Sequence, residues 1–198
     1  RPTSSAFGKS AGTEVHLLRA HQSPRVTRDD VSAVVYDFDG TLVDLVVDWN
    51  AVAEEVADVL ATDGVDASDA DLWRMLDLAD EADLRPAVED VISAHECDGA
   101  RQSTRLRHAD LVADHDVPVG VCSLNAEAAC RVGLEVHDLA VDVDAVVGRD
   151  SVATRKPDPE PLLTTLRRLD ADGDALFVGD SRRDELTAER AGVAFEWV

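Results

Sequence analysis

The most constraining feature of the chain is a short apolar run that ends in two aspartates. Residues 32–36 are Ser-Ala-Val-Val-Tyr, and this β-branched and aromatic pattern is typical of a buried strand. Asp37 and Asp39 follow one residue apart, directly before a Gly-Thr pair. Where a strand gives way to a loop, the two carboxylates can converge, and they repel unless a cation or a proton separates them. The stretch therefore predicts a metal site or an acid/base pair.

Further apolar runs alternate with helical patterns along the rest of the chain. Strands that alternate with helices predict a parallel sheet with helices packed on its faces. We therefore expect an α/β fold built on a doubly wound parallel sheet. The later strands are expected over residues 117–122, 145–148, 175–178 and 193–198.

Polar residues stand near the ends of these strands. Ser123 follows the second strand, Asp180 follows the fourth, and Lys156 opens the segment that leads into the helix after the third. Binding sites in open α/β sheets form at the carboxyl ends of strands, so we expect these residues near Asp37. A serine before a helix is also a common N-cap, and that explanation of Ser123 stays open. Lys156 is notable because Lys9 is the only other lysine.

Residues 45–99 have helical periodicity and no cluster of catalytic residues. We expect three short helices there: one over residues 48–61, one capped by Asp69, and one that begins at Pro86. The acids of this segment are expected to form a solvated face. A fourth helix is expected over residues 100–114, before the second strand.

Acidic residues outnumber basic residues by 41 to 19, for a formal net charge of -22. Such a charge opposes binding to nucleic acid and to anionic membranes, which requires basic patches. It also strains the fold by self-repulsion in dilute buffer, whereas the Debye length falls to about 3 Å in molar salt. The aspartate-rich, lysine-poor composition is typical of organisms that keep molar salt in the cytoplasm, so we expect a halophilic archaeon. An ordinary acidic protein is the alternative.

Other features of the sequence concern its compartment. No apolar run approaches the length of about 20 residues that a membrane span needs, and no secretory signal is visible. The three cysteines form no C-x-x-C pair, which is typical of a reducing compartment. We therefore expect a cytoplasmic protein without a membrane or nucleic-acid partner. Residues 1–30 have weak periodicity and are expected to form a loosely ordered arm.

The polar motifs together resemble the haloacid dehalogenase superfamily, on its phosphatase side, and in general pattern its phosphoglycolate phosphatase-like members. The first motif of the superfamily, D-x-D-G-T-L-x-D, is intact at residues 37–44. The second, an apolar strand that ends in Ser or Thr, matches at Ser123, and the third, a lysine before a proline, matches at Lys156. The fourth, G-D-S-x-x-D, matches residues 179–184.

The resemblance implies a division of the chain into a core and a cap. The α/β core is expected to comprise residues 31–44 and 100–198, and the helical cap is expected to comprise residues 45–99. Such a cap closes over the site, excludes water and selects the substrate.

The resemblance also implies roles for individual residues. Asp37 would be the nucleophile that forms an aspartyl-phosphate, and Asp39 would act as the general acid and base. Mg²⁺ would be held by Asp37, Asp180 and Asp184 together with the backbone carbonyl of Asp39. The remaining residues of the set would bind the transferred phosphoryl group: Thr41, Ser123, Leu124 and Lys156.

These roles predict an Mg²⁺-dependent phosphatase that hydrolyses a small phosphorylated metabolite. Dehalogenases of the superfamily lack an acid at the position of Asp39, because halide departure needs no proton, so dehalogenation is not expected. A phosphomutase similar to β-phosphoglucomutase would use the same residues and is the first alternative. A catalytically inactive binding domain is the second, and the intact motif residues argue against it.

Overall fold

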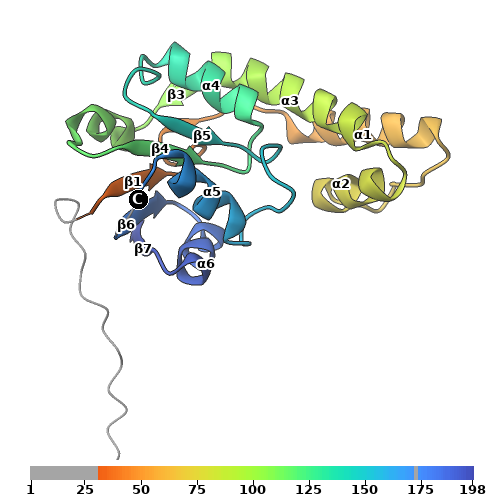
Figure 1. The fold of residues 1–198 in the computed structure, drawn as a ribbon. Helices are drawn as coiled ribbons and strands as arrows, with labels where there is room; N and C mark the ends of the chain where they lie inside the picture. Colours follow the sequence, from red (N-terminus) through yellow and green to blue (C-terminus); the bar gives the residue numbers. More distant parts are fainter. Residues whose placement is uncertain (1–30, 172–173) are drawn as a thin grey trace, which may run out of the picture.

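Five parallel strands form the centre of the computed structural model, which describes residues 31–171 and 174–198. Their order across the sheet is β5-β4-β1-β6-β7 (Figure 1). This arrangement confirms the parallel α/β sheet expected from the sequence, while the arm predicted over residues 1–30 lies outside the described residues. The strands are β1 (Ala33–Tyr36), β4 (Val119–Cys122), β5 (Ala145–Val147), β6 (Ala175–Gly179) and β7 (Ala194–Trp197).

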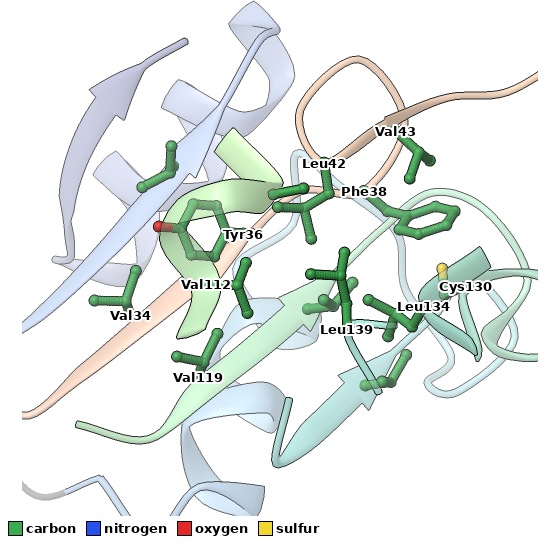
Figure 2. Packing of buried hydrophobic residues seen from close by; sticks show 14 of the residues in the cluster. Val34, Tyr36, Phe38, Leu42, Val43, Val112, Val119, Cys130, Leu134 and Leu139 are labelled. Atoms are coloured by element: carbon green, nitrogen blue, oxygen red, sulfur yellow. The ribbon is translucent and has the colours of Figure 1, made fainter. Parts of the chain in front are cut away.

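Side chains of β1 alternate between the two faces of the sheet. Val34 and Tyr36 belong to one hydrophobic cluster, whereas Ala33 and Val35 belong to another, together with Phe177 of β6. Successive side chains of a strand point to opposite faces, so an entirely apolar strand must be covered on both. Figure 2 shows the first of these clusters around Val34 and Tyr36.

Helices cover both faces of the sheet (Figure 1). The face of Val34 and Tyr36 is covered by α4 (Glu127–Val136) and by a 3-10 helix, Arg107–Asp114. The opposite face is covered by α5 and α6. Because the strands are parallel, their carboxyl ends lie at one edge of the sheet, between the two helical layers. The bounds of the two helices on the second face are Glu160–Arg168 for α5 and Arg182–Ala191 for α6.

Three further helices form a unit with a hydrophobic cluster of its own, here called the three-helix unit. Its cluster includes Val56, Leu76 and Ile92 and shares no buried residue with the two clusters of the sheet. In the described ranges no helix, of this unit or elsewhere, is long and apolar enough to cross a bilayer. The three helices are α1 (Trp49–Thr62), α2 (Leu72–Glu81) and α3 (Arg85–Arg101).

The three-helix unit joins the rest of the chain through a short antiparallel pair, β2 (Val43–Asp44) and β3 (Thr104–Arg105). The two segments that connect the three-helix unit to the sheet layers therefore lie side by side. α3 also packs along α4, so the unit is attached to the sheet layers by more than its two connections (Figure 1). The assignment of residues 45–99 to a separate cap domain stays a prediction.

The start of α2 differs from the prediction. Asp71, rather than Asp69, is the N-cap, because its carboxylate accepts a hydrogen bond from the backbone N–H of Arg74 at 2.8 Å. The start of α3 agrees within one residue, since the helix begins at Arg85 and Pro86 follows. Local sequence thus offered two aspartates as caps, and the packed geometry selects the second.

The helix expected over residues 100–114 is wrong. α3 continues through Arg101, and the chain then forms β3 before the 3-10 helix begins at Arg107. The backbone N–H of Leu106 donates to the carbonyl of Leu42 at 2.9 Å, in line with the β2–β3 pair. Pairing with a distant segment therefore overrides the helical periodicity of this stretch.

Candidate active site

The predicted site residues come from the ends of neighbouring strands. Asp37 follows β1, Ser123 follows β4, and Asp180 follows β6. Because β1 pairs in parallel with both other strands, these three residues lie at one edge of the sheet. Lys156 reaches the same edge from the segment between β5 and α5. Segments far apart in the sequence thus meet where sites form in this class of fold.

Lys156 is the centre of a buried charged cluster. Its ammonium nitrogen lies 2.8 Å from Oδ1 of Asp37 and 2.5 Å from Oδ1 of Asp184. It also donates to the carbonyl oxygen of Cys122 at 3.1 Å. The residue is only 3% exposed, so these acceptors replace water for the three N–H donors of the ammonium. We call Lys156, Asp37, Asp184 and the neighbouring Asp180 the lysine cluster.

Carboxylates crowd one side of the lysine cluster. Ligand oxygens of Asp37, Asp180 and Asp184 lie within 4.8 Å of one another. Three carboxylates outnumber one ammonium, so the cluster has an excess of negative charge that a divalent cation would neutralise. Aspartate oxygens are ligands that Mg²⁺ prefers, and the residues present therefore fit the ion expected from the sequence.

Asp184 and Asp180 are held in different ways. Asp184 is fully buried, and its Oδ2 accepts hydrogen bonds from the backbone N–H and the hydroxyl of Ser181, at 3.1 and 2.5 Å. This capping box begins α6, while Lys156 occupies the other oxygen of Asp184. Asp180 is exposed and lies against Gly40, where a Cβ would come within 2.2 Å of its Oδ2. Asp180 thus offers the freer oxygens, and Asp184 orients the lysine.

Burial shifts the protonation of these acids. It raises the pKa of Asp37 to about 7, although the charge of Lys156 acts in the opposite direction. Partial burial also raises the pKa of Asp39, and partial desolvation together with the charge of Asp184 raises that of Asp180. A cation beside these carboxylates would favour their charged forms and lower the pKa values again. The charge state of the cluster is therefore coupled to binding of a cation.

A pocket of about 470 Å³ opens over the lysine cluster. Asp37 and Asp180 line it from the sheet edge, whereas Trp49, Leu72 and Trp73 line it from the three-helix unit. Pockets of this size, with an apolar wall and a few convergent polar groups, are typical of small-molecule sites. The sheet edge and the three-helix unit therefore share one site.

The remaining predicted residues lie at different depths around this pocket. Asp39 lines it, and its carboxylate accepts a hydrogen bond from the backbone N–H of Leu45 at 2.9 Å. Ser123 and Leu124 also line the pocket. Thr41 does not line it and is fully buried. Its hydroxyl oxygen is the one buried side-chain polar atom without a hydrogen-bond partner in the described part of the chain.

A second buried charged cluster was missed by the sequence prediction. Glu96 of α3 is 1% exposed, and its carboxylate accepts hydrogen bonds from Arg149 at 2.8 Å, from Asn125 Nδ2 at 3.1 Å and from the backbone N–H of Ala126 at 2.9 Å. Arg149 also pairs with Glu89 at 2.7 Å. The expected solvated face is therefore wrong for Glu89 and Glu96, because both acids bind a buried arginine. We call Arg149, Glu89 and Glu96 the arginine cluster.

The arginine cluster reaches the predicted phosphate-binding loop. The hydroxyl of Ser123 donates to Oδ1 of Asn125 at 3.0 Å and accepts from the backbone N–H of Asn125 at 3.1 Å. The side-chain amide of Asn125 in turn donates to Glu96. A carboxylate from the three-helix unit thus orients the residue that holds the Ser123 hydroxyl.

A sequence signal for Glu96 was present in the spacing of α3. Val88, Ile92 and Glu96 are four residues apart, and the first two belong to the hydrophobic cluster of the three-helix unit. Residues four apart share a helix face, so Glu96 stands on the buried face. A buried carboxylate requires a partner, yet the sequence does not say that Arg149 supplies it.

Comparison with known proteins identifies the family. A family profile described as Haloacid dehalogenase-like hydrolase matches residues 109–198. A phosphoglycolate phosphatase from Escherichia coli O157:H7 is 30% identical over 201 residues, covering 83% of this chain and 79% of that protein. A phosphoglycolate phosphatase from Rhodospirillum rubrum is 45% identical over 83 residues, which cover 41% of this chain and 34% of that protein. The chain thus spans about a third of that second relative's length.

Solved structures agree with these sequence matches. A HAD-superfamily hydrolase of subfamily IA, variant 1, from Geobacter sulfurreducens PCA superimposes with a TM-score of 0.56 at 28% identity. The alignment covers 83% of this chain and 88% of that chain. The resemblance inferred from the four motifs is confirmed, and the chain belongs to the haloacid dehalogenase-like hydrolase family.

Proposed function

We propose that the chain is a phosphatase that releases phosphate from a small phosphomonoester in the presence of Mg²⁺. The observation that carries this proposal is the lysine cluster, in which Lys156 lies between Asp37 and Asp184 while Asp180 faces the same point. Phosphoryl transfer depends on positioning and charge neutralisation more than on covalent chemistry. A carboxylate nucleophile and a candidate cation site at the pocket, with a buried ammonium in contact with that nucleophile, meet those needs.

In the proposed reaction, an oxygen of Asp37 attacks phosphorus in line with the leaving oxygen. The bond between phosphorus and the leaving oxygen breaks, and Asp39 delivers a proton to the departing alcohol. Water then attacks the aspartyl-phosphate, Asp39 takes up its proton, and the bond between phosphorus and Asp37 breaks. Phosphate leaves and both aspartates return to their starting states.

The other residues of the site would hold charge and position. Mg²⁺, when bound, would neutralise charge on the phosphoryl oxygens. Lys156 would orient the attacking oxygen of Asp37 and face the negative phosphoryl group. The hydroxyl of Ser123, which lines the pocket, would exchange its hydrogen bond to Oδ1 of Asn125 for one to a phosphoryl oxygen. A phosphate contact by Thr41 stays a prediction, because its unpartnered hydroxyl is fully buried and does not line the pocket. In this proposal the ion is held by Asp37, Asp180, Asp184 and the backbone carbonyl of Asp39, and Leu124 completes the phosphate-binding loop.

The pocket favours a small substrate. Its volume is about 470 Å³, and side chains of α1 and α2 line one wall of it. A site of this size suits a metabolite rather than a polymer. The net charge of -22 argues in the same direction against nucleic acid. The phosphoglycolate phosphatases among the relatives support a short phosphorylated organic acid as the first compound to assay.

The proposal is tested by phosphate release in molar KCl with Mg²⁺, from p-nitrophenyl phosphate and from phosphoglycolate. Asp37→Asn is expected to lower release at least about a thousandfold, because an amide cannot form the aspartyl-phosphate. Its Tm is expected to hold, because Lys156 keeps Asp184 and the Cys122 carbonyl as partners and the amide oxygen of asparagine can still accept from it. Asp90→Asn, at an exposed position on α3, is the matched control. Activity that survives Asp37→Asn or excess EDTA contradicts the mechanism.

A phosphomutase would share the lysine cluster and differ in the fate of the phosphoryl group. It would return the group from Asp37 to a sugar instead of to water. Incubation with hexose phosphates and identification of the products separates the two reactions. Inorganic phosphate is the product expected here, and an isomeric sugar phosphate would favour the mutase.

A further inference from the structure

Two basic side chains line the pocket within the described residues, Arg149 and Arg183. Arg149 has no donor left for a ligand. Its Nε donates to Glu89 at 3.0 Å, and its two terminal nitrogens donate to Glu89, to both oxygens of Glu96 and to the carbonyl of Leu124. An arginine has five N–H donors, and these contacts use all of them. Arg149 therefore fastens the three-helix unit to the sheet loops and does not bind substrate.

Arg183 is in a different situation. Its guanidinium carbon lies 5.5 Å from the ring centroid of Trp73, and that of Arg155 lies 5.3 Å from the same ring. Arg155 donates to Asp77 of α2 at 2.9 Å, so its charge is matched. No acidic side chain of residues 31–171 and 174–198 forms an ion pair with Arg183, which is exposed and faces the pocket. The indole of Trp73 thus contacts two guanidinium groups. That of Arg155 is paired with Asp77, and that of Arg183 has no acidic partner among the described residues.

We propose that Arg183 binds a second anionic group of the substrate, a carboxylate or a second phosphate, at the end opposite the transferred phosphoryl group. This inference rests on the proposed phosphatase function. The indole of Trp73 limits the orientations of the guanidinium and leaves its N–H donors free. A carboxylate or phosphate fits a planar guanidinium in bidentate geometry.

The rest of the pocket wall strengthens this assignment. Trp49, Leu72 and Trp73 offer no charge to an anion, and Asp71 would repel one. An anion that enters the pocket without a partner is costly to desolvate. Of the described side chains that line the pocket, Arg183 is therefore the one that can pair with a second negative charge, since the donors of Arg149 are already used.

A structural explanation for Arg183 makes a different prediction. If the contact with Trp73 only holds the three-helix unit against the sheet layers, its loss should affect all substrates alike. If Arg183 binds an anion, its loss should affect only substrates that carry the second charge. Matched substrates separate the two explanations: phosphoglycolate, ethane-1,2-diol bisphosphate and 2-hydroxyethyl phosphate share a phosphate ester and differ at the far end.

The experiment compares kcat/KM for these three substrates in wild type, Arg183→Gln and Arg183→Lys. In Arg183→Gln, the ratio of kcat/KM for an anionic substrate to that for 2-hydroxyethyl phosphate is expected to fall about 10- to 100-fold. Arg183→Lys should restore part of the ratio. The control is Arg182→Gln, because Arg182 pairs with Glu185 and does not line the pocket. Unchanged ratios in Arg183→Gln overturn the proposal, whether or not kcat/KM falls equally for all three substrates. The anionic substrate with the larger fall identifies the group.

A binding measurement makes the result independent of turnover. Calorimetric titration of Asp37→Asn protein with the three compounds, with Mg²⁺ present, gives Kd values without hydrolysis. Adding Arg183→Gln should weaken binding of at least one anionic compound about tenfold or more, relative to 2-hydroxyethyl phosphate. Equal Kd shifts for all three overturn the proposal. If wild type hydrolyses none of them, the phosphatase function fails, while the titrations still decide the role of Arg183.

Discussion

Two charged clusters in the described part of the chain each place one cation between carboxylates, but they differ in charge balance. In the lysine cluster, Lys156 contacts Asp37 and Asp184, and Asp180 adds a further negative group. In the arginine cluster, Arg149 contacts Glu89 and Glu96. Arg85 supplies the second positive charge there, because it donates to Glu89 at 2.9 Å. The first cluster is short of positive charge and the second is balanced.

The difference between the clusters indicates their roles. Buried charges are stable only when they are paired and hydrogen-bonded. The arginine cluster meets that condition within the protein, and its contacts run between α3 and the loops that follow β4 and β5. The lysine cluster does not meet it and opens into the pocket. A balanced cluster suits attachment, and an unbalanced one suits binding of a cation and a phosphoryl group.

Breaking the arginine cluster should have the largest effect on stability. Arg149→Met leaves Glu96 buried without its counter-charge, which is expected to cost about 3–5 kcal/mol of unfolding free energy. Urea unfolding monitored by circular dichroism measures the loss. Arg131→Met, which removes an exposed pair with Glu127, is the control and should cost below about 1 kcal/mol. Equal losses of unfolding free energy in the two variants would show that the buried pair contributes no more to stability than the exposed pair.

Completing the lysine cluster should stabilise the protein by a smaller amount. Mg²⁺ at 100 times its Kd is expected to add about 2.7 kcal/mol, because the ion binds the folded state. The Tm measured with Mg²⁺ should therefore exceed that in EDTA. Asp180→Asn is expected to remove most of this increase, whereas Asp90→Asn should retain it. An increase of the same size in Asp180→Asn argues against an ion at the lysine cluster.

Glu96 connects the arginine cluster to the loop that carries Ser123, and a mild change there should affect catalysis. Glu96→Gln keeps the size of the side chain but loses its charge and one of the two oxygens that accept from Arg149, Asn125 and Ala126. The loop that orients Ser123 should loosen, and kcat is expected to fall about tenfold. Glu89→Gln is the matched control, since Glu89 binds Arg149 but not the loop. A similar fall of kcat in both variants would assign the effect to general destabilisation.

Added salt should weaken repulsion between surface charges and leave the buried ion pairs of both clusters largely unscreened. The net charge of -22 predicts that Tm rises with KCl, because the Debye length shortens from about 10 Å at 0.1 M to about 3 Å at 1 M. Buried pairs are screened much less, so the stability lost in Arg149→Met should be the same at both salt concentrations. Differential scanning fluorimetry measures both quantities. A Tm that is flat or falls with KCl contradicts the halophilic origin expected from composition.

Particular elements show how far sequence reasoning reached. The apolar, β-branched run over residues 32–36 predicted a buried strand, and the order of strands and helices predicted the parallel sheet. The motif residues Asp37, Lys156 and Asp180 were predicted to meet, and they do so at the sheet edge. Their catalytic roles stay a prediction until the assays above are done. The cap of α2 and the helix over residues 100–114 were wrong, since local periodicity does not include distant pairing.

The sequence by itself determined the features that depend on neighbours along the chain. Strand periodicity and the residues directly after each strand are local, and parallel topology brings the strand ends together without further information. The tertiary structure alone decided that Glu96 meets Arg149 and that Arg183 shares Trp73 with Arg155. These contacts depend on how the three-helix unit packs against the loops. Charge balance at a buried point depends on every segment that reaches it, and only the folded chain shows which segments do.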